Sequence, residues 1–202
     1  PDVTVNQQLQ DVARALRWIR DHGSQYPCDM RNIMLTGDSA GGQLAAYSAV
    51  LMQSAQLRKT FDTVDPQMEL TALLLTSPVA FMRDGGLFSL YTKPMWGTDY
   101  KDKATYPYMD FDQIIDYAQA LPPTYLITSS GDTLANKQTH RLYEVLQAHG
   151  VQAEIKDYAK AEYDQSLPHV FSVLQPFEPA GTAAIDKALA FYQQAMTAKA
   201  AQ

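Results

Sequence analysis

A serine lies between two glycines in the segment Gly37-Asp38-Ser39-Ala40-Gly41, with an apolar run before it and a helical pattern after it. This pattern predicts a strand, a sharp turn and a helix, with the serine at the apex, as in the G-x-S-x-G arrangement of a nucleophile. A Cβ at either flanking glycine would collide with the neighbouring strand or helix. We therefore predict that Ser39 is a nucleophile whose helix offers N–H groups to an oxyanion; the alternative is an idle serine in a glycine-rich turn.

A serine hydroxyl is a weak nucleophile at neutral pH, so it needs a base that takes its proton. That base in turn needs a carboxylate partner that fixes its tautomer. In open α/β sheets such groups gather at the carboxyl ends of the strands. Asp132 follows the apolar run 125–128 across a turn of small residues, and it is the predicted carboxylate. It would also suit the N-cap of a helix beginning near Leu134, and the two roles are compatible. Glu162 and Asp164 are the alternatives.

Four histidines are candidates for the base. His22 and His149 each precede a glycine that is predicted to end a helix, and His140 lies in the middle of a helical pattern. His169 follows the last predicted strand and is the one placed to reach Ser39. The order Ser39, Asp132, His169 is the Ser…Asp…His order of one hydrolase class and differs from two other serine hydrolase orders.

The elements that must position these residues follow from hydrophobic periodicity. Strands are predicted at 33–36, 70–76, 125–128 and 151–158, and helices at 6–21, 43–54, 111–120, 134–149 and 182–197. The stretch 53–66 has the composition of a polar connection, and 81–111 that of an irregular segment rich in aromatic residues. Strands alternate with helices, which predicts the α/β class, with a mainly parallel sheet, helices on both faces and one domain over residues 1–202.

Two finer expectations concern helix ends and helix packing. Gly23 and Gly150 each follow a helical pattern and are predicted stops, with Gly23 in the left-handed capping position. In the last helix the large apolar residues recur at helical spacing and are predicted to dock on the sheet. They are Ile185, Leu189, Tyr192 and Met196.

Composition excludes several classes of function. The chain has 202 residues, 46% of them hydrophobic, and a net charge of −6 without any basic run, so nucleic acid is not an expected partner. The single cysteine, Cys28, precludes an intrachain disulfide and a cysteine metal cluster, and no cofactor or metal is expected. We see no signal peptide and no apolar run long enough to span a membrane, so the expected location is cytoplasmic.

These motifs resemble the α/β-hydrolase superfamily, and within it the hormone-sensitive-lipase-like esterases and lipases of the fold-3 group. The matching segments are 37–42, 121–126 with 131–134, 149–151 and 169–171, in the family's order from about residue 1 to the C-terminus. The resemblance implies hydrolysis of small carboxylic esters, with Ser39 as nucleophile, His169 as base and Asp132 as its partner. It also implies that the amide of Ala40 is one oxyanion donor.

One departure from the family pattern concerns the segment before Ser39. The family draws further oxyanion donors from a His-Gly-Gly-Gly loop, but the early His22-Gly23-Ser24 here ends a helix. Only 38 residues precede Ser39, too few for the family's first strands. We expect the C-terminal portion of a longer hydrolase, the alternative being a short variant. The edge of strand 33–36 would then be covered by upstream residues or by a second copy in a homodimer.

The remaining predictions concern supporting residues and substrate. Asp38 is expected to orient the triad from outside it, and Gly37 and Gly41 to permit the turn. Four residues of the irregular segment are candidates for an acyl pocket, the alternative being ordinary packing. They are Phe88, Tyr91, Met95 and Trp96. A peptidase, an acetyl-ester deacetylase or a non-catalytic binding module on the same fold are the alternative functions.

Overall fold

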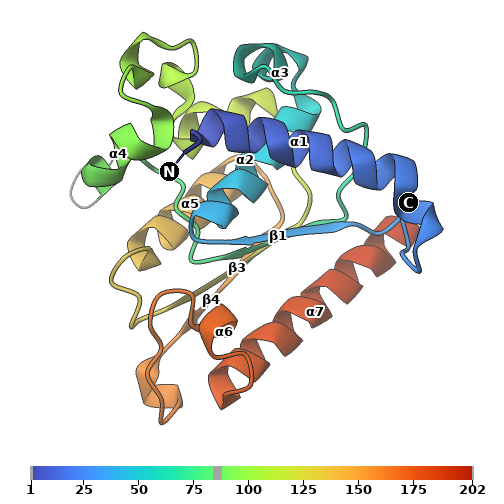
Figure 1. Ribbon diagram of the computed structural model, residues 1–202. Helices are drawn as coiled ribbons and strands as arrows, with labels where there is room; N and C mark the ends of the chain where they lie inside the picture. Colours follow the sequence, from blue (N-terminus) through green and yellow to red (C-terminus); the bar gives the residue numbers. More distant parts are fainter. Residues whose placement is uncertain (1, 84–87, 202) are drawn as a thin grey trace. The chain divides into compact units, whose positions relative to one another are not determined.

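Four parallel strands form a sheet in the computed structural model of the protein, which describes residues 2–83 and 88–201. The strands pair in chain order, each with the next. They are β1 (Met34–Asp38), β2 (Ala72–Thr76), β3 (Thr124–Ser129) and β4 (Ala153–Tyr158). The predicted α/β class and parallel sheet are confirmed, and the carboxyl ends of all four strands lie at one edge (Figure 1).

Seven α-helices occur in the described ranges. They are α1 (Val5–His22), α2 (Ala40–Gln53), α3 (Ala55–Phe61), α4 (Phe88–Trp96), α5 (Asn136–Ala148), α6 (Phe171–Leu174) and α7 (Pro179–Ala200). Short 3₁₀ turns lie at Gly23–Gln25, Tyr100–Asp102, Tyr106–Tyr108, Phe111–Gln113, Ile115–Tyr117 and Lys160–Glu162. None of the described helices combines the length and the apolar character that crossing a membrane requires.

The chain divides into two units. The first comprises Pro1–Arg31, Ala46–Glu69 and Ala80–Leu121, and the second comprises Asn32–Ala45, Leu70–Val79 and Pro122–Gln202. All four strands belong to the second unit, as do α5, α6, α7 and residues 40–45 of α2. The second unit therefore contains every strand end at which a site was predicted.

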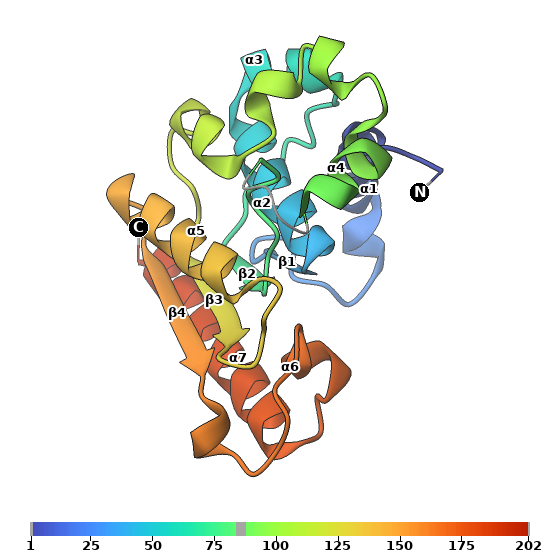
Figure 2. The ribbon, with the colours of Figure 1, turned by 90° about the vertical axis from the view of Figure 1, so that its left-hand side faces the viewer.

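In the second unit, helices cover both faces of the sheet (Figures 1 and 2). Side chains alternate along a strand, and one face presents Ala72, Tyr125, Ile127 and Tyr158 to α7. The intervening residues Leu73, Leu75 and Leu126 are buried on the other face, where α5 contacts β3 and β4. This double burial explains the continuous apolar run in β2.

The packing face of α7 differs from the predicted one. The buried residues are the small side chains Ala180, Gly181, Ala184, Ala188 and Ala195, together with Phe191. Ile185 and Leu189 are instead 38% and 46% exposed, whereas Tyr192 packs against this core as predicted and Met196 is half-buried. Small residues let the helix axis approach the sheet closely, so the prediction is wrong at Ile185 and Leu189.

In the first unit, aromatic side chains form the core. The ring of Tyr47 meets the rings of Phe61, Trp96 and Phe111 edge-on, with centroids 6.2–6.4 Å apart. At the start of α1, the side chain of Thr4 accepts from the amide of Gln7 in a capping box, which fixes where that helix begins.

Several predicted elements of the first unit were wrong. The polar connection 53–66 contains α3, and the irregular segment 81–111 contains α4, although residues 84–87 of that segment lie outside the described ranges. The predicted helix 111–120 is two 3₁₀ turns. Gly23 is right-handed at φ −57°, so the predicted left-handed conformation is wrong there, and an added Cβ would meet only the flexible side chain of Met30. Gly150 is left-handed as predicted, at φ +72°.

Candidate active site

Ser39 stands at the apex of the turn between β1 and α2. β1 ends at Asp38 and α2 begins at Ala40, and Ser39 itself has φ +50°, which L-residues rarely adopt. Its amide donates to the carbonyl of Thr76 (2.9 Å), and its carbonyl accepts from the amide of Val79 (3.0 Å). These two bonds fix the strained turn against the end of β2.

Close packing around the turn explains two of its glycines. A Cβ at Gly37 would lie 2.2 Å from the carbonyl oxygen of Gly41, and one at Gly42 would lie 2.9 Å from Cβ of Pro78. A Cβ at Gly41 would meet nothing within 4 Å. The steric prediction is therefore confirmed at Gly37 but wrong at Gly41, and Gly42 is the second glycine that close approach requires.

Asp132 follows β3 and its side chain is fully buried, at 0% exposure. Its Oδ1 accepts from the amides of Leu134 (3.0 Å) and Ala135 (2.8 Å), just before α5 begins. Its Oδ2 lies 3.0 Å from Nδ1 of His169. One carboxylate thus bonds both the histidine and two amides of the turn ahead of α5, but the predicted N-cap role is wrong, because the cap position of that helix is Ala135, which makes no side-chain cap.

The charged form of Asp132 is favoured in spite of its burial. Burial alone would raise the pKa of the carboxyl, because it disfavours the charge. The hydrogen bonds from His169 and from the amide of Ala135, with a smaller contribution from Ser77, outweigh burial and lower that pKa. The carboxylate is therefore ionised at neutral pH and can only accept hydrogen bonds.

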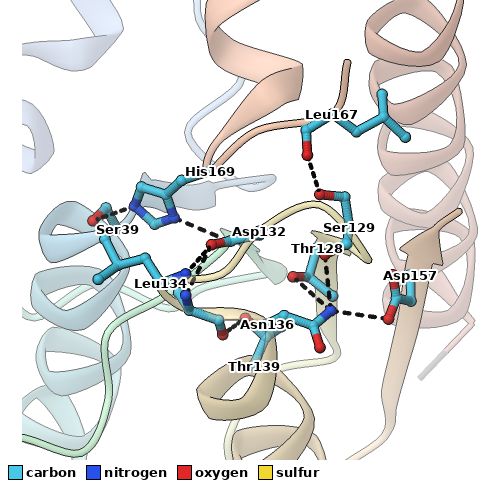
Figure 3. Close-up of polar contacts among 11 residues, drawn as sticks. Ser39, Thr128, Ser129, Asp132, Leu134, Asn136, Thr139, Asp157, Leu167 and His169 are labelled. Carbon is cyan, nitrogen blue, oxygen red and sulfur yellow. Dashed lines mark hydrogen bonds and ion pairs between the residues drawn. The ribbon is translucent and has the colours of Figure 1, made fainter. Parts of the chain in front are cut away.

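His169 lies between the other two residues (Figure 3). Its Nε2 is 2.8 Å from Oγ of Ser39, and its Nδ1 is 3.0 Å from Oδ2 of Asp132. Since an ionised carboxylate cannot donate, Nδ1 carries the proton and Nε2 is left to accept from the serine hydroxyl. The ring is 23% exposed, so one edge of it remains open to solvent.

The loop that carries His169 is tied to the end of β3. The hydroxyl of Ser129 donates to the carbonyl of Leu167 (2.7 Å; Figure 3), and a Cβ at Gly131 would lie 2.3 Å from that carbonyl oxygen. After the histidine, Val170 takes the left-handed conformation at φ +53° and α6 begins. These contacts set the direction from which the imidazole approaches.

Within the described ranges, no hydrogen bond joins the alternative acids and bases to Ser39. Glu162 pairs with Lys156 at 3.2 Å, and Asp164 is exposed. Nδ1 of His22 lies 2.9 Å from a carbonyl oxygen of α1, and Nδ1 of His149 lies 2.7 Å from a carbonyl oxygen of α5. Nε2 of His140 lies 2.9 Å from a carboxylate oxygen of Asp157 on β4.

Asp38 and Ala40 flank Ser39 as predicted. Asp38 is exposed, and within the described ranges no hydrogen bond links its side chain to the triad residues. Ala40 is the first residue of α2. Its N–H is therefore one of the first-turn amides that have no acceptor within the helix. An orienting role for Asp38 and an oxyanion role for Ala40 stay predictions.

The predicted pocket residues all lie on α4 in the first unit. Trp96 is buried against Tyr47 of the same unit, whereas Tyr91 is 50% exposed. Phe88 and Met95 are half-buried. Their role in a pocket stays a prediction.

Sequence reasoning missed polar residues that hold the strand ends together. The side-chain amide of Asn136 donates to the carbonyl of Ser129 (3.0 Å) and to Asp157 (2.9 Å), which joins α5 to β3 and β4 (Figure 3). Ser77 is fully buried directly after β2. Sequence position alone does not single them out, because Ser77 is one of several polar residues that follow a strand and Asn136 is the first residue of α5.

Comparisons with known proteins agree with this geometry. Residues 1–166 match a family described as alpha/beta hydrolase fold. The probable carboxylic ester hydrolase LipM of Mycobacterium tuberculosis is 26% identical over 195 residues, which cover 94% of this chain and 44% of LipM.

Solved structures of one esterase are also similar. A crystal structure of esterase B from Lactobacillus rhamnosus superposes with a TM-score of 0.89 and 28% identity, covering 98% of this chain and 64% of that one. Another, described as inhibited with a C4-C4 SN3 tributyrin phosphonate, gives a TM-score of 0.87 and 29% identity, covering 100% and 66%. This chain thus spans less than half of LipM and about two thirds of esterase B.

Proposed function

Because the chain belongs to the alpha/beta hydrolase fold family, we propose that it is a serine hydrolase that cleaves carboxylic esters through an acyl-enzyme intermediate. The observation that carries the proposal is the hydrogen-bonded line from Ser39 through His169 to Asp132, with distances of 2.8 and 3.0 Å. Such a line makes a serine hydroxyl nucleophilic at neutral pH.

In the first half-reaction, Oγ of Ser39 attacks the ester carbonyl carbon while Nε2 of His169 takes the hydroxyl proton. The tetrahedral intermediate then collapses, the bond to the alkoxy oxygen breaks, and His169 returns its proton to that oxygen, so the alcohol leaves. In the second half, His169 takes a proton from water as the water attacks the acyl carbon, and then gives it back to Ser39. The carboxylate of Asp132 stabilises the imidazolium in both halves.

The negative charge on the carbonyl oxygen needs donors that are already in place. The amide of Ala40 begins α2 directly after the nucleophile, and the positive end of the helix dipole lies there. We assign one oxyanion donor to this amide. One donor of this kind contributes about 10²–10³ in rate, so the rate of this chain depends on which further donors reach the carbonyl oxygen.

Short acyl esters are the proposed substrates. Esterase B, 28–29% identical to this chain, is described as inhibited by a tributyrin phosphonate, an analogue of a four-carbon acyl ester. Hydrolysis of p-nitrophenyl butyrate in preference to acetylated sugars would support this substrate class over a deacetylase.

The decisive experiment compares wild type with Ser39→Ala, using p-nitrophenyl acetate and butyrate. We expect the alanine variant to lose on the order of 10⁶-fold in kcat, while Ser166→Ala, an exposed serine in the loop before His169, retains wild-type activity. A fluorophosphonate should add to wild type once, with the adduct mapped to Ser39 by peptide mass spectrometry. If wild type neither hydrolyses esters nor takes the label, the proposal is wrong and a binding module is favoured.

A further inference from the structure

The segment Ser77-Pro78-Val79 forms a turn at the carboxyl end of β2. Ser77 is 0% exposed and has φ +45°, a conformation that serine adopts rarely. Its amide donates to the carbonyl of Ile127 in β3 (2.7 Å). Strained residues of this kind persist where the surrounding structure fixes them, and they gather at functional sites.

This turn contacts Ser39 and the start of α2. The amide of Val79 donates to the carbonyl of Ser39 (3.0 Å). Pro78 packs so closely on the start of α2 that a Cβ at Gly42 would come within 2.9 Å of the proline Cβ. The position of Ser77 is therefore coupled to that of the Ser39 turn.

Ser77 also follows the strand that pairs with β3, and β3 leads to the buried Asp132. The Asp132 carboxylate has about four acceptor positions, and three are filled by the amides of Leu134 and Ala135 and by His169. The Ser77 hydroxyl is buried and makes no well-formed hydrogen bond to any described residue. A buried donor without an acceptor thus follows β2, and a carboxylate with an unfilled acceptor position follows the neighbouring strand β3. The Ser77 hydroxyl also contributes to the lowered pKa of the Asp132 carboxyl.

We propose that Ser77 is a positioning residue for the proposed hydrolysis: its hydroxyl completes the hydrogen bonding of the Asp132 carboxylate and so holds Oδ2 toward His169. The inference rests on the proposed function for its role in catalysis. Hydrogen bonds in catalytic sites are often long in the free enzyme and shorten when substrate binds, so we expect this bond to form fully in the substrate complex. The same turn holds Ser39, so it sets the nucleophile and the acid in one frame.

The test uses two substitutions of Ser77, each made in the otherwise unaltered full-length protein. Ser77→Ala removes the hydroxyl, and Ser77→Gly removes it while relieving the strain at positive φ. We expect both variants to lose roughly tenfold in kcat, the effect of one hydrogen bond to a charged group, with KM within about twofold of wild type. The acid limb of the kcat/KM profile should move to higher pH in both, because the ionised Asp132 is less favoured.

Ser48→Ala is the matched control. Ser48 is also a buried serine whose hydroxyl makes no hydrogen bond within the described ranges, but it lines a small apolar cavity of the first unit with Leu9 and Ala13. This variant should keep the wild-type kcat and pH profile. Wild-type kcat in Ser77→Gly together with a low value in Ser77→Ala would assign the position to backbone conformation and overturn the proposal.

A second readout needs no turnover. The proton between Nδ1 of His169 and Asp132 gives a far-downfield proton NMR signal when the pair is well aligned, and we expect Ser77→Ala to shift or broaden this signal at every pH. An unchanged signal and titration in Ser77→Ala would overturn the proposal. If wild type fails to hydrolyse esters, the proposed function fails, while this spectrum still decides whether Ser77 positions Asp132.

Discussion

At the scale of single residues, Asp132 combines complete burial with a negative charge. Its Oδ1 holds two backbone amides and its Oδ2 holds His169. Asp132→Asn keeps a carbonyl oxygen for the amides but removes the charge that stabilises the imidazolium and fixes its tautomer. We expect kcat to fall by about 10³–10⁴, measured with p-nitrophenyl butyrate, while circular dichroism at pH 7 shows a folded protein.

The same substitution tests the pH dependence of stability. The pKa of Asp132 is lowered in the folded chain, against about 3.9 when unfolded. A lowered folded pKa gives stability that is present above the unfolded pKa and is lost as pH falls through the folded one. Urea unfolding from pH 6 to pH 2 should therefore show a steeper loss below about pH 4 in wild type than in Asp132→Asn. Parallel curves would contradict this assignment.

The three reacting residues could be predicted because their types and positions are constrained together. A serine in a glycine turn, an aspartate after the next strand but one and a histidine after the last strand must meet where parallel strands end. Ser77 could not be found this way, because a serine after a strand is common and only its burial and positive φ distinguish it. Gly42 was overlooked since its requirement comes from Pro78, a residue distant in sequence.

At the scale of elements, α7 shows how packing distance decides which residues are buried. The adjacent residues Ala188 and Leu189 are 3% and 46% exposed. Ala188→Leu should destabilise the fold by about 1–3 kcal/mol through overpacking against the sheet. Leu189→Ala should change stability by no more than about 0.5 kcal/mol. Urea unfolding monitored by circular dichroism measures both.

The same two substitutions, at Ala188 and Leu189, also define the result that would contradict this packing of α7. If the stripe of large residues had packed on the sheet, Leu189→Ala would cost about 2–5 kcal/mol and Ala188→Leu would be tolerated. That result would show that α7 is rotated relative to the arrangement described above.

Other element predictions depended on how clearly the sequence marks each end. The strands and the helices α1, α5 and α7 have long periodic or apolar patterns, and these were found. α3 was missed because it has only two buried apolar residues, Leu57 and Phe61, although Ser54 caps its start. The segment 111–120 carries helical spacing, but its buried residues Phe111 and Ile115 belong to separate 3₁₀ turns. Local propensity cannot tell such turns from a helix.

At the scale of the whole molecule, the sheet has β1 at one edge and β4 at the other. Along β1, residues Met34 and Leu35 are half-buried, and Thr36 is exposed. A strand edge presents unpaired N–H and C=O groups that can pair with another strand. The sequence-based expectation of a covering segment or a second copy at this edge stays a prediction, and it can be tested on the 202-residue chain.

We expect the 202-residue chain to associate as its concentration rises, because β1 of one copy can pair with β1 of another. Thr36→Lys adds a charge at an exposed position of this strand and should weaken the association, with little effect on the core. Ser166→Lys adds the same charge in an exposed loop and should associate like wild type, which separates edge pairing from a change in net charge. Sedimentation velocity over a range of concentrations measures all three. Identical monomeric sedimentation of the three proteins would show that the β1 edge is not a pairing surface in this chain, and equal weakening by both lysines would attribute the association to charge.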